Sequence, residues 1–365
     1  MADPAPGSEP GAHPTADGIL PSDPLRERPG GPLRPIRLGP NQPADRFYRG
    51  GDRISQFRGV APSGSHVPED WVGSVTTIAG EEVLGLTRLA DGRLLADAIA
   101  EDPIAWLGPE HVAAHGSDPL LLVKLLDPGQ RLPVHAHPDD TWAASHLGRP
   151  HGKAEAWYIL EPGEVFVGLR RPIGSDQLAR LVSEQDIDSL IGLLHRRDVR
   201  TGDTVFVPPG TLHAIGEGTL LAEVQQPEDL SILLEWRDFD IDGAVAGHLG
   251  VGFPTALGAV DRQPLSTDDL DQLITSHRTG SSILSSRADQ YFRADHHEVT
   301  ERVVLAPGFS ILIVTDGLVD VGTAGGSLAA PMGSTILIPH AAGAVSLTGS
   351  GAGLVFRPPD RPLAI

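Results

Sequence analysis

The chain has 365 residues, enough for two domains of ordinary size or for one large domain with a tail. It contains no cysteine, which excludes disulfides, thiolate nucleophiles, cysteine-rich zinc knuckles and iron–sulfur clusters. A formal net charge of −20 argues against nucleic acid or an anionic membrane as a partner, because both need a basic protein face. No run approaches the roughly 18 apolar residues of a membrane span, and no signal peptide is recognisable, so a cytoplasmic protein is expected.

Residues 1–45 are rich in proline and glycine and poor in large apolar side chains, which predicts a disordered tail. The first region after it, 46–265, contains short apolar runs bounded by turn residues. These runs predict strands at 120–126, 154–160, 165–169, 204–207 and 220–224. Between the third and fourth of them, apolar residues at three-and-four spacing predict a helical insertion over about 175–197.

A second strand-rich region covers residues 266–365, with its clearest strands predicted at 303–305, 310–314, 335–338 and 354–356. Short strands separated by glycine and proline turns are typical of antiparallel sandwiches and jelly rolls. The expected fold is therefore mainly β, with two jelly-roll barrels. The first barrel carries the helical insertion, and the second lacks a full set of metal ligands.

Four residues of the first region are candidate ligands of one metal ion. His135 and His137 are two apart on a predicted strand, so their imidazoles point to the same face. Glu155 shares a strand face with apolar neighbours, where a carboxylate needs a cation or a metal as partner. His213 follows a tight turn that returns a strand into the barrel. Three nitrogens and one oxygen suit zinc, and less selectively iron, manganese, nickel or cobalt, so one divalent ion, Zn²⁺ first, is the expected cofactor.

The spacing of these residues resembles the paired motif of the cupin superfamily. In that motif Gly, five residues and His-x-His precede a Glu, and Gly, five residues, Pro-x-Gly, two residues and His follow. The matching residues here are Gly129, His135, His137, Glu155, Gly202, Pro208, Gly210 and His213. Such spacing is highly specific. The resemblance implies that both predicted barrels are cupin barrels.

Further segments are similar to one cupin family, the class I mannose-6-phosphate isomerases. They are Lys153-Ala-Glu-Ala-Trp-Tyr158, the helical insertion and Glu223-Val-Gln-Gln226. Segments 47–51, 68–74 and 289–292 extend the resemblance over nearly everything after the tail. It implies a zinc-dependent aldose–ketose isomerase that interconverts mannose 6-phosphate and fructose 6-phosphate through an enediolate, with a sugar or sugar phosphate as its partner.

Two positions depart from the family pattern. His135 stands where the family usually has glutamine, a change that keeps a ligand and strengthens nitrogen donation. Leu233 stands where the family carries an arginine that is assigned to catalysis; Arg237, four residues further on, is the candidate replacement. The departures keep three alternatives open: an isomerase of a different, unphosphorylated sugar, a sugar-binding or regulatory cupin without catalysis, and a metal-dependent oxygenase or lyase.

The chain has only two lysines, Lys124 and Lys153, and they flank the first pair of histidines. Lys153 shares the strand face of Glu155 and is a candidate catalytic base, with a pKa lowered by burial near a cation. A structural ion pair with Glu155 or a substrate anchor is the alternative. Lys124 is expected to bind substrate. Glu223 and Gln225 share one strand face and are expected to bind sugar hydroxyls or to orient a ligand, with plain surface positions as the alternative.

Overall fold

The computed structural model describes residues 1, 33–276, 279–280 and 282–360. The predicted disordered tail falls mostly on residues 2–32, which lie outside the described residues. Its last part is wrong, because Ile36–Leu38 forms strand β1 and pairs with β17, Ile36 opposite Leu337. Leu38 is buried in the main apolar cluster, and Ile36 packs against that cluster. This strand is not predictable from the sequence, because its short apolar stretch lies between segments rich in proline and glycine.

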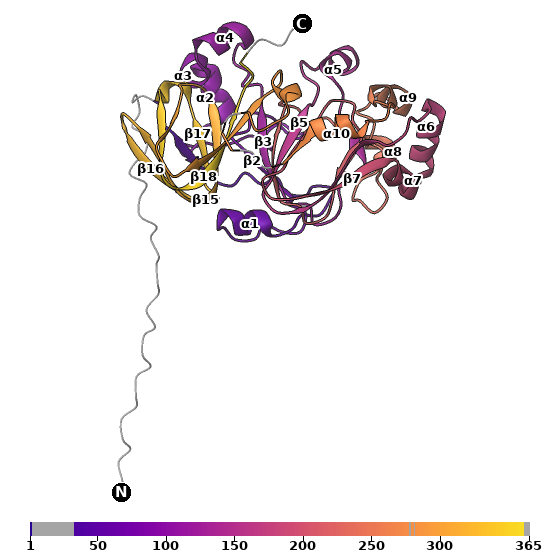
Figure 1. Ribbon diagram of the computed structural model, residues 1–365, viewed down its shortest axis with the longest axis horizontal. Helices are drawn as coiled ribbons and strands as arrows, with labels where there is room; N and C mark the ends of the chain where they lie inside the picture. The colour runs from indigo at the N-terminus through magenta and orange to yellow at the C-terminus, as the bar shows by residue number, and fades with distance from the viewer. Residues whose placement is uncertain (2–32, 277–278, 281, 361–365) are drawn as a thin grey trace. The chain divides into compact units, whose positions relative to one another are not determined.

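The described residues form three antiparallel sheets (Figure 1). The seven-stranded sheet holds most of the predicted second region and consists of β1 (Ile36–Leu38), β17 (Thr335–Ile338), β15 (Ser310–Thr323), β18 (Val345–Arg357), β13 (Arg293–Val299), β14 (Val303–Leu305) and β16 (Gly326–Pro331). All four strands predicted there lie within β14, β15, β17 and β18. A mainly β, cupin-like fold of antiparallel sheets is thereby confirmed.

The other two sheets hold the candidate ligands. The six-stranded sheet runs in the order β12 (Ile274–Thr275), β8 (Thr204–Val207), β5 (Glu155–Ile159), β10 (Leu221–Gln225), β3 (Leu122–Leu126) and β2 (Glu69–Val72). The five-stranded sheet runs in the order β11 (Ile232–Leu233), β4 (His135–Ala136), β9 (His213–Ile215), β6 (Gly163–Leu169) and β7 (Leu194–Val199). All five strands predicted in the first region form.

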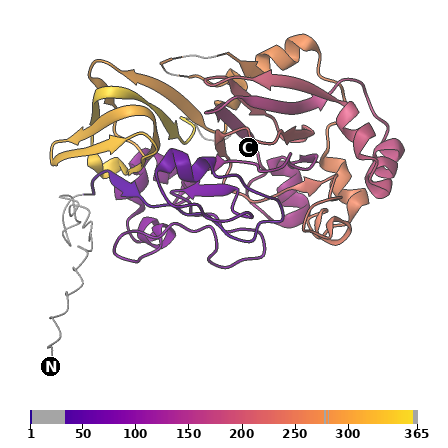
Figure 2. The same cartoon turned by 90° about the horizontal axis from the view of Figure 1, so that it is seen from below.

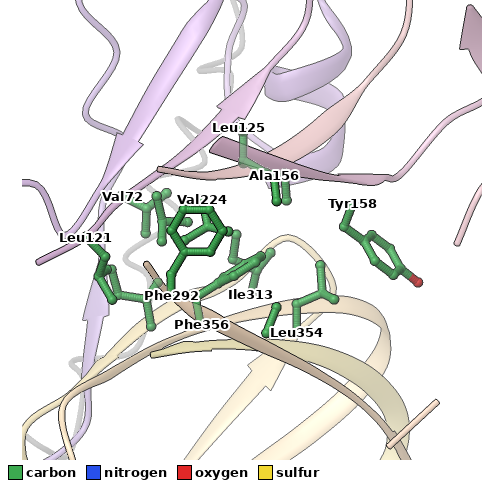
Figure 3. Packing of buried hydrophobic residues seen from close by; sticks show 14 of the residues in the cluster. Val72, Leu121, Leu125, Ala156, Tyr158, Val224, Phe292, Ile313, Leu354 and Phe356 are labelled. Carbon is green, nitrogen blue, oxygen red and sulfur yellow. The ribbon is translucent and has the colours of Figure 1, made fainter. Parts of the chain in front are cut away.

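The six-stranded sheet is a middle layer that is buried on both faces. On β5, Ala156 and Tyr158 belong to the cluster that joins this sheet to the seven-stranded one, and Figure 3 shows them with Phe292 and Phe356. Trp157 and the residues beside it on the opposite face pack against the five-stranded sheet. Burial on both faces explains why these strands are continuous apolar runs, and each large buried side chain stabilises the fold by about 1.5–3 kcal/mol.

The helices lie in the connections between strands: α1 (Arg53–Arg58), α2 (Leu95–Glu101), α3 (Pro103–Leu107), α4 (Pro109–His115), α5 (Asp140–Leu147), α6 (Ser175–Glu184), α7 (Ile187–Gly192), α8 (Gly243–Ala246), α9 (Phe253–Ala256) and α10 (Thr267–Leu273). Three short 3₁₀ turns cover Leu257–Ala259, Ser286–Ala288 and His340–Ala342. None of the helices within the described ranges is both long and apolar enough to cross a bilayer.

The predicted helical insertion forms as two helices, α6 and α7, beside the five-stranded sheet, and both views place it there (Figures 1 and 2). Leu178, Leu181 and Val182 bury one face of α6, as the three-and-four spacing predicts. The predicted end near residue 197 is too late. From Leu194 the burial alternates with period two, so this segment forms β7 instead of helix.

The boundary predicted between residues 265 and 266 is too early. Leu270 of α10 is buried in the cluster between the six-stranded and five-stranded sheets, and β12 pairs with β8, Ile274 opposite Val205. The chain therefore stays with the first two sheets until Thr275. Conversely, β1, which precedes the first region's other strands in the chain, pairs with β17 and so belongs to the seven-stranded sheet.

Candidate metal centre and pocket

The three candidate histidines meet between the two sheets of the first region. His135 on β4 lies directly opposite His213 on β9, so both side chains leave the sheet on one face. Their ring centroids are 4.0 Å apart, and the ring of His137 lies 4.9 Å from each. One nitrogen of each histidine lies within 4.8 Å of the others. The expectation that these three imidazoles converge is therefore confirmed.

The backbone holds each imidazole in a defined orientation. Nδ1 hydrogen-bonds a backbone carbonyl in every case: Pro133 for His135 at 2.8 Å, Leu230 for His137 at 2.6 Å and Thr211 for His213 at 2.8 Å. Because a carbonyl only accepts, each Nδ1 carries the proton and each Nε2 keeps its lone pair. All three rings thereby have the tautomer of a metal ligand.

A turn with glycine at its tip aims His213 at the other two rings. Gly210 has φ of 81°, in the left-handed region that glycine adopts without a steric penalty. Its N–H donates to the carbonyl of His137 at 2.7 Å, which ties the turn to the segment carrying the first two histidines. The conformation and this contact explain why glycine precedes the third ligand.

Glu155 completes the group. Its two carboxylate oxygens lie 3.1 Å from Nε2 of His137 and 3.1 Å from Nε2 of His213, and all four residues are buried. Despite these distances, both Nε2 atoms and Oε2 of Glu155 have no hydrogen-bond partner. The Lys153 ammonium lies 3.0 Å from the same Oε2, so the two Nε2 atoms are the groups without a donor. Buried polar atoms are normally satisfied, so these converging lone pairs beside a carboxylate indicate a site for a cation.

The protonation states suit metal binding. Burial lowers the pKa of His137 to about 3, with help from the Lys153 ammonium, and burial with the neighbouring imidazoles lowers the pKa of His135 well below its usual range. Burial alone would raise the pKa of Glu155, but Lys153, His137 and His213 hold it well below its usual range. Neutral imidazoles and an ionised carboxylate are the forms that bind a divalent metal.

A row of charged side chains extends from Glu155 across the middle sheet. Glu223 on β10 stands opposite Lys124 on β3, with Nζ of Lys124 3.8 Å from Glu223 and 3.4 Å from Glu69 on β2. The same ammonium lies over the ring of Trp71, 4.5 Å from its centroid. Lys124 lines the pocket, and both lysines of the chain are buried in it.

The pocket continues from this row to the segment that precedes α1. The Arg46 guanidinium lies 2.9 Å from Glu69 and 3.8 Å from Asp229. The lining comprises Arg46, Phe47, Tyr48, Glu69, Lys124, Leu126, Leu132, Pro133, His135, Lys153, Glu155, Ile215, Glu223, Asp229, Ser231 and Leu233. The cavity volume is about 50 Å³, enough for an ion with a few waters.

Two predicted residues lie elsewhere. Arg237 is exposed and donates to the carbonyl of Glu184 at 3.4 Å, outside the pocket lining, so it does not take the place of the arginine expected at Leu233. The strand β11 ends at Leu233, and the chain then turns toward the insertion. Gln225 is buried opposite Glu155. Its Nε2 donates to the carbonyls of Gln226 and Glu228, so its side chain stabilises the backbone at the end of β10.

Four lining residues escaped the sequence analysis: Arg46, Tyr48, Glu69 and Asp229. A signal existed for Glu69, because it alternates with Trp71 on a short strand, the same pattern that singled out Glu155. Trp71 Nε1 donates to Glu69 at 3.2 Å. No comparable local signal marks Arg46 or Asp229, since loop residues have no periodicity and only the fold brings them together.

The surroundings of Lys153 differ from those predicted. Its ammonium lies 3.0 Å from Glu155. Burial lowers its pKa, but Glu155, Glu223 and Asp229 outweigh burial and raise the pKa above its usual value. In the metal-free protein the ammonium is therefore held in its charged form. The prediction counted burial and a nearby cation but missed the three carboxylates.

Whereas Lys153 is held in its charged form, Glu223 is held in its neutral form, which gives a prediction for the metal-free protein. Burial, followed by the charges of Glu155 and Glu69, raises the pKa of Glu223 from 4.5 to about 7. The folded state thus retains a proton that the unfolded chain releases, so stability is lost as the pH rises through about 7. Glu223→Gln should leave the free energy of unfolding unchanged near pH 4.5 and raise it by about 3 kcal/mol at pH 8, in urea unfolding.

The matched control for this experiment is Glu301→Gln, which removes an exposed carboxylate. It should shift neither curve by more than about 0.5 kcal/mol. An equal effect of Glu223→Gln at both pH values would contradict the raised pKa.

Together, the antiparallel sheets and the buried histidine group define a cupin-like β protein with a candidate metal centre. No family model matches the chain. Among curated proteins it is 36% identical over 125 residues to the mannose-6-phosphate isomerase of Streptococcus mutans and 37% identical over 125 residues to mannose-6-phosphate isomerase ManA of Bacillus subtilis. Each match covers 33% of this chain and 37% of the relative.

A longer match joins the chain to YvyI of Bacillus subtilis, with 35% identity over 196 residues, 53% of this chain and 60% of the relative. The matches thus span from about a third to three fifths of the relatives' lengths. The fold similarity is wider. A mannose 6-phosphate isomerase structure from Bacillus subtilis has a TM-score of 0.66 at 22% identity, covering 89% of this chain and 100% of the other.

The apo mannose 6-phosphate isomerase from Salmonella typhimurium has a TM-score of 0.69 at 15% identity, covering 90% of this chain and 100% of the other. At such identities these structures establish the fold. The curated relatives show, over a third to about half of this chain, the resemblance to mannose-6-phosphate isomerases that the motifs predict.

Proposed function

We propose that this protein is a metal-dependent aldose–ketose isomerase. The observation that carries the proposal is the convergence of three buried histidines beside Glu155, with Nε2 of His137 and of His213 lacking a hydrogen-bond partner, at one end of a pocket lined by charged side chains. Three nitrogens and one oxygen are a donor set for zinc, held by His135, His137, Glu155 and His213. When bound, a divalent ion there would supply Lewis-acid polarisation of a sugar carbonyl and its neighbouring hydroxyl.

The protein's own residues move the proton. Isomerisation removes a proton from the carbon beside the carbonyl and returns it to the neighbouring carbon, through an enediolate. Two groups in the pocket can hold that proton, Lys153 and Glu223. Lys153 lies against Glu155, and Glu223 is the next carboxylate along the middle sheet. Glu223 is a carboxylate that can take up the proton and return it, while a protonated Lys153 stabilises the developing oxyanion.

Two substrate pairs are candidates. The names of the curated relatives support mannose 6-phosphate and fructose 6-phosphate. The corresponding unphosphorylated sugars are supported by the apolar Leu233 in the pocket lining, where the family pattern has an arginine. Both pairs undergo the same chemistry at the first two carbons.

The experiment is a coupled assay of the zinc-reconstituted protein with mannose 6-phosphate, free mannose and other aldoses. Conversion of an aldose to its ketose is expected, with loss of turnover after chelation and recovery when zinc is returned. A protein that binds zinc but converts no aldose would contradict the proposed reaction and favour the non-catalytic sugar-binding alternative.

A further inference from the structure

We infer that the pocket accepts a neutral, unphosphorylated aldose and discriminates against sugar phosphates. This inference rests on the proposed isomerase function and names the substrate class of the same site. It follows from how the charges of the pocket wall are paired, at the end of the pocket that lies away from the histidines.

The reacting end of a sugar has a defined place. The carbonyl and its neighbouring hydroxyl belong beside the histidine group and Glu155, so the rest of the sugar extends along the charged row of the middle sheet. Neighbouring strands are about 4.8 Å apart, and β3 is the second strand from β5, so Lys124 is roughly 10 Å from the Glu155 strand. Arg46 and Glu69 lie beyond it. A phosphate on the far carbon of the sugar would therefore meet this group.

At the far end, the cations Arg46 and Lys124 are both paired with carboxylates. Arg46 is 2.9 Å from Glu69 and 3.8 Å from Asp229, while Lys124 is 3.4 Å from Glu69 and 3.8 Å from Glu223. The remaining cation of the lining, Lys153, is 3.0 Å from Glu155. Within the described lining, every lysine and arginine thus has a carboxylate within 4 Å.

A phosphate ester is poorly matched to this arrangement. It carries about −1.5 to −2 charges at neutral pH and needs donors that are not already neutralised. To reach Arg46 or Lys124, the phosphate would have to displace Glu69. Burial alone would raise the pKa of Glu69, but Arg46 and Lys124 lower it to about 2. Glu69 therefore stays charged at any pH of interest. Adding a dianion beside a buried carboxylate is opposed by repulsion in a low-dielectric pocket.

A neutral sugar is well matched to the same groups. Carboxylates accept hydrogen bonds from hydroxyls, and Glu69, Glu223 and Asp229 present acceptors along the length that a sugar chain would occupy. Tyr48 and Ser231 add hydroxyls, and Leu233 adds an apolar contact. The carboxylates that oppose a phosphate thus serve as recognition groups for hydroxyls.

The first test compares kcat/KM of the zinc-loaded full chain for free aldoses, mannose first, with kcat/KM for mannose 6-phosphate. A free aldose is expected to be favoured by at least about tenfold. Preference for mannose 6-phosphate would overturn the inference while leaving the isomerase function intact. Absence of turnover on every sugar, with zinc bound, would instead contradict the proposed function and the inference together.

A second test changes the charge at the far end. Asp229→Asn keeps the size of the side chain and an oxygen to accept from the Ala79 N–H, bonded at 3.1 Å, but removes one carboxylate charge from Arg46. The ratio of kcat/KM for mannose 6-phosphate to that for the free aldose should rise about tenfold, mainly through a lower KM for the phosphosugar. Asp198→Asn, on an exposed position of β7, is the control and should leave the ratio unchanged. An unchanged ratio in Asp229→Asn would overturn the inference.

Discussion

His137→Ala is expected to abolish zinc binding and with it all isomerase activity, while the β-sheets still form. The substitution removes a buried Nε2 donor from a group of four. Loss of a ligand should lower zinc affinity by more than the roughly 100-fold that follows from losing an outer-shell partner. The cost to the apo fold is limited to the Leu230 carbonyl, which loses its donor at 2.6 Å, about 1–3 kcal/mol.

The measurement is the zinc content after dialysis, together with circular dichroism and the coupled assay. His146→Ala is the matched control, because His146 lies exposed on α5, in the loop region that follows the first two ligands. It should bind zinc as the parent does. Full zinc content or full activity in His137→Ala would refute the metal-centre assignment.

Lys153→Met is expected to keep the metal and to reduce turnover by about 10² to 10³-fold, the usual cost of removing one group that stabilises a developing oxyanion. Methionine preserves the apolar stem of the side chain and removes only the ammonium that lies 3.0 Å from Glu155. Zinc content and kcat are to be measured in the same preparation, so that loss of metal is separated from loss of chemistry.

The chain offers one matched comparison, Lys124→Met. This lysine is equally buried but belongs to the far end of the pocket, so its loss should raise KM with a much smaller fall in kcat. Full turnover in Lys153→Met would contradict the role of this ammonium in stabilising the oxyanion. Glu223→Gln should be inactive, because it removes the group that moves the proton.

The convergence of the candidate ligands was predictable because it depends on local patterns. Two histidines two apart on a strand must share a face, and the structure places their rings 4.9 Å apart. Glu155 was found because a carboxylate alternating with apolar residues is costly without a partner. The strand positions were predictable for a related reason: the middle sheet is apolar on both faces, so its strands are continuous apolar runs.

The far end of the pocket depends on contacts between segments far apart in the chain. Arg46 precedes α1 and Asp229 follows β10. No pattern in either segment predicts the 3.8 Å contact between their side chains. The same limitation explains the failure of Arg237 as a replacement cation. Its position in the sequence is close to that of Leu233, but β11 ends between them and the chain turns away from the pocket.

Domain boundaries failed because strands are exchanged between regions. β1 lies in the predicted tail yet pairs with β17 in the C-terminal sheet, and β12 lies in the predicted second region yet pairs with β8. The amino-acid composition of β1 and β12 does not show which strand either of them pairs with. A short strand of two or three residues is stabilised by the edge it joins, and that edge exists only in the folded protein.

The burial of both lysines has a practical consequence for handling the protein. Lys124 and Lys153 are the only side-chain amines in the chain, and each is about 95% or more buried, so the surface carries no lysine at all. Reagents that couple, cross-link or dye-label proteins through primary amines should therefore react readily only with the α-amino group, since both lysine amines are buried. Slow acylation of either lysine therefore becomes a reporter of pocket opening, free of the background that surface lysines give in most proteins.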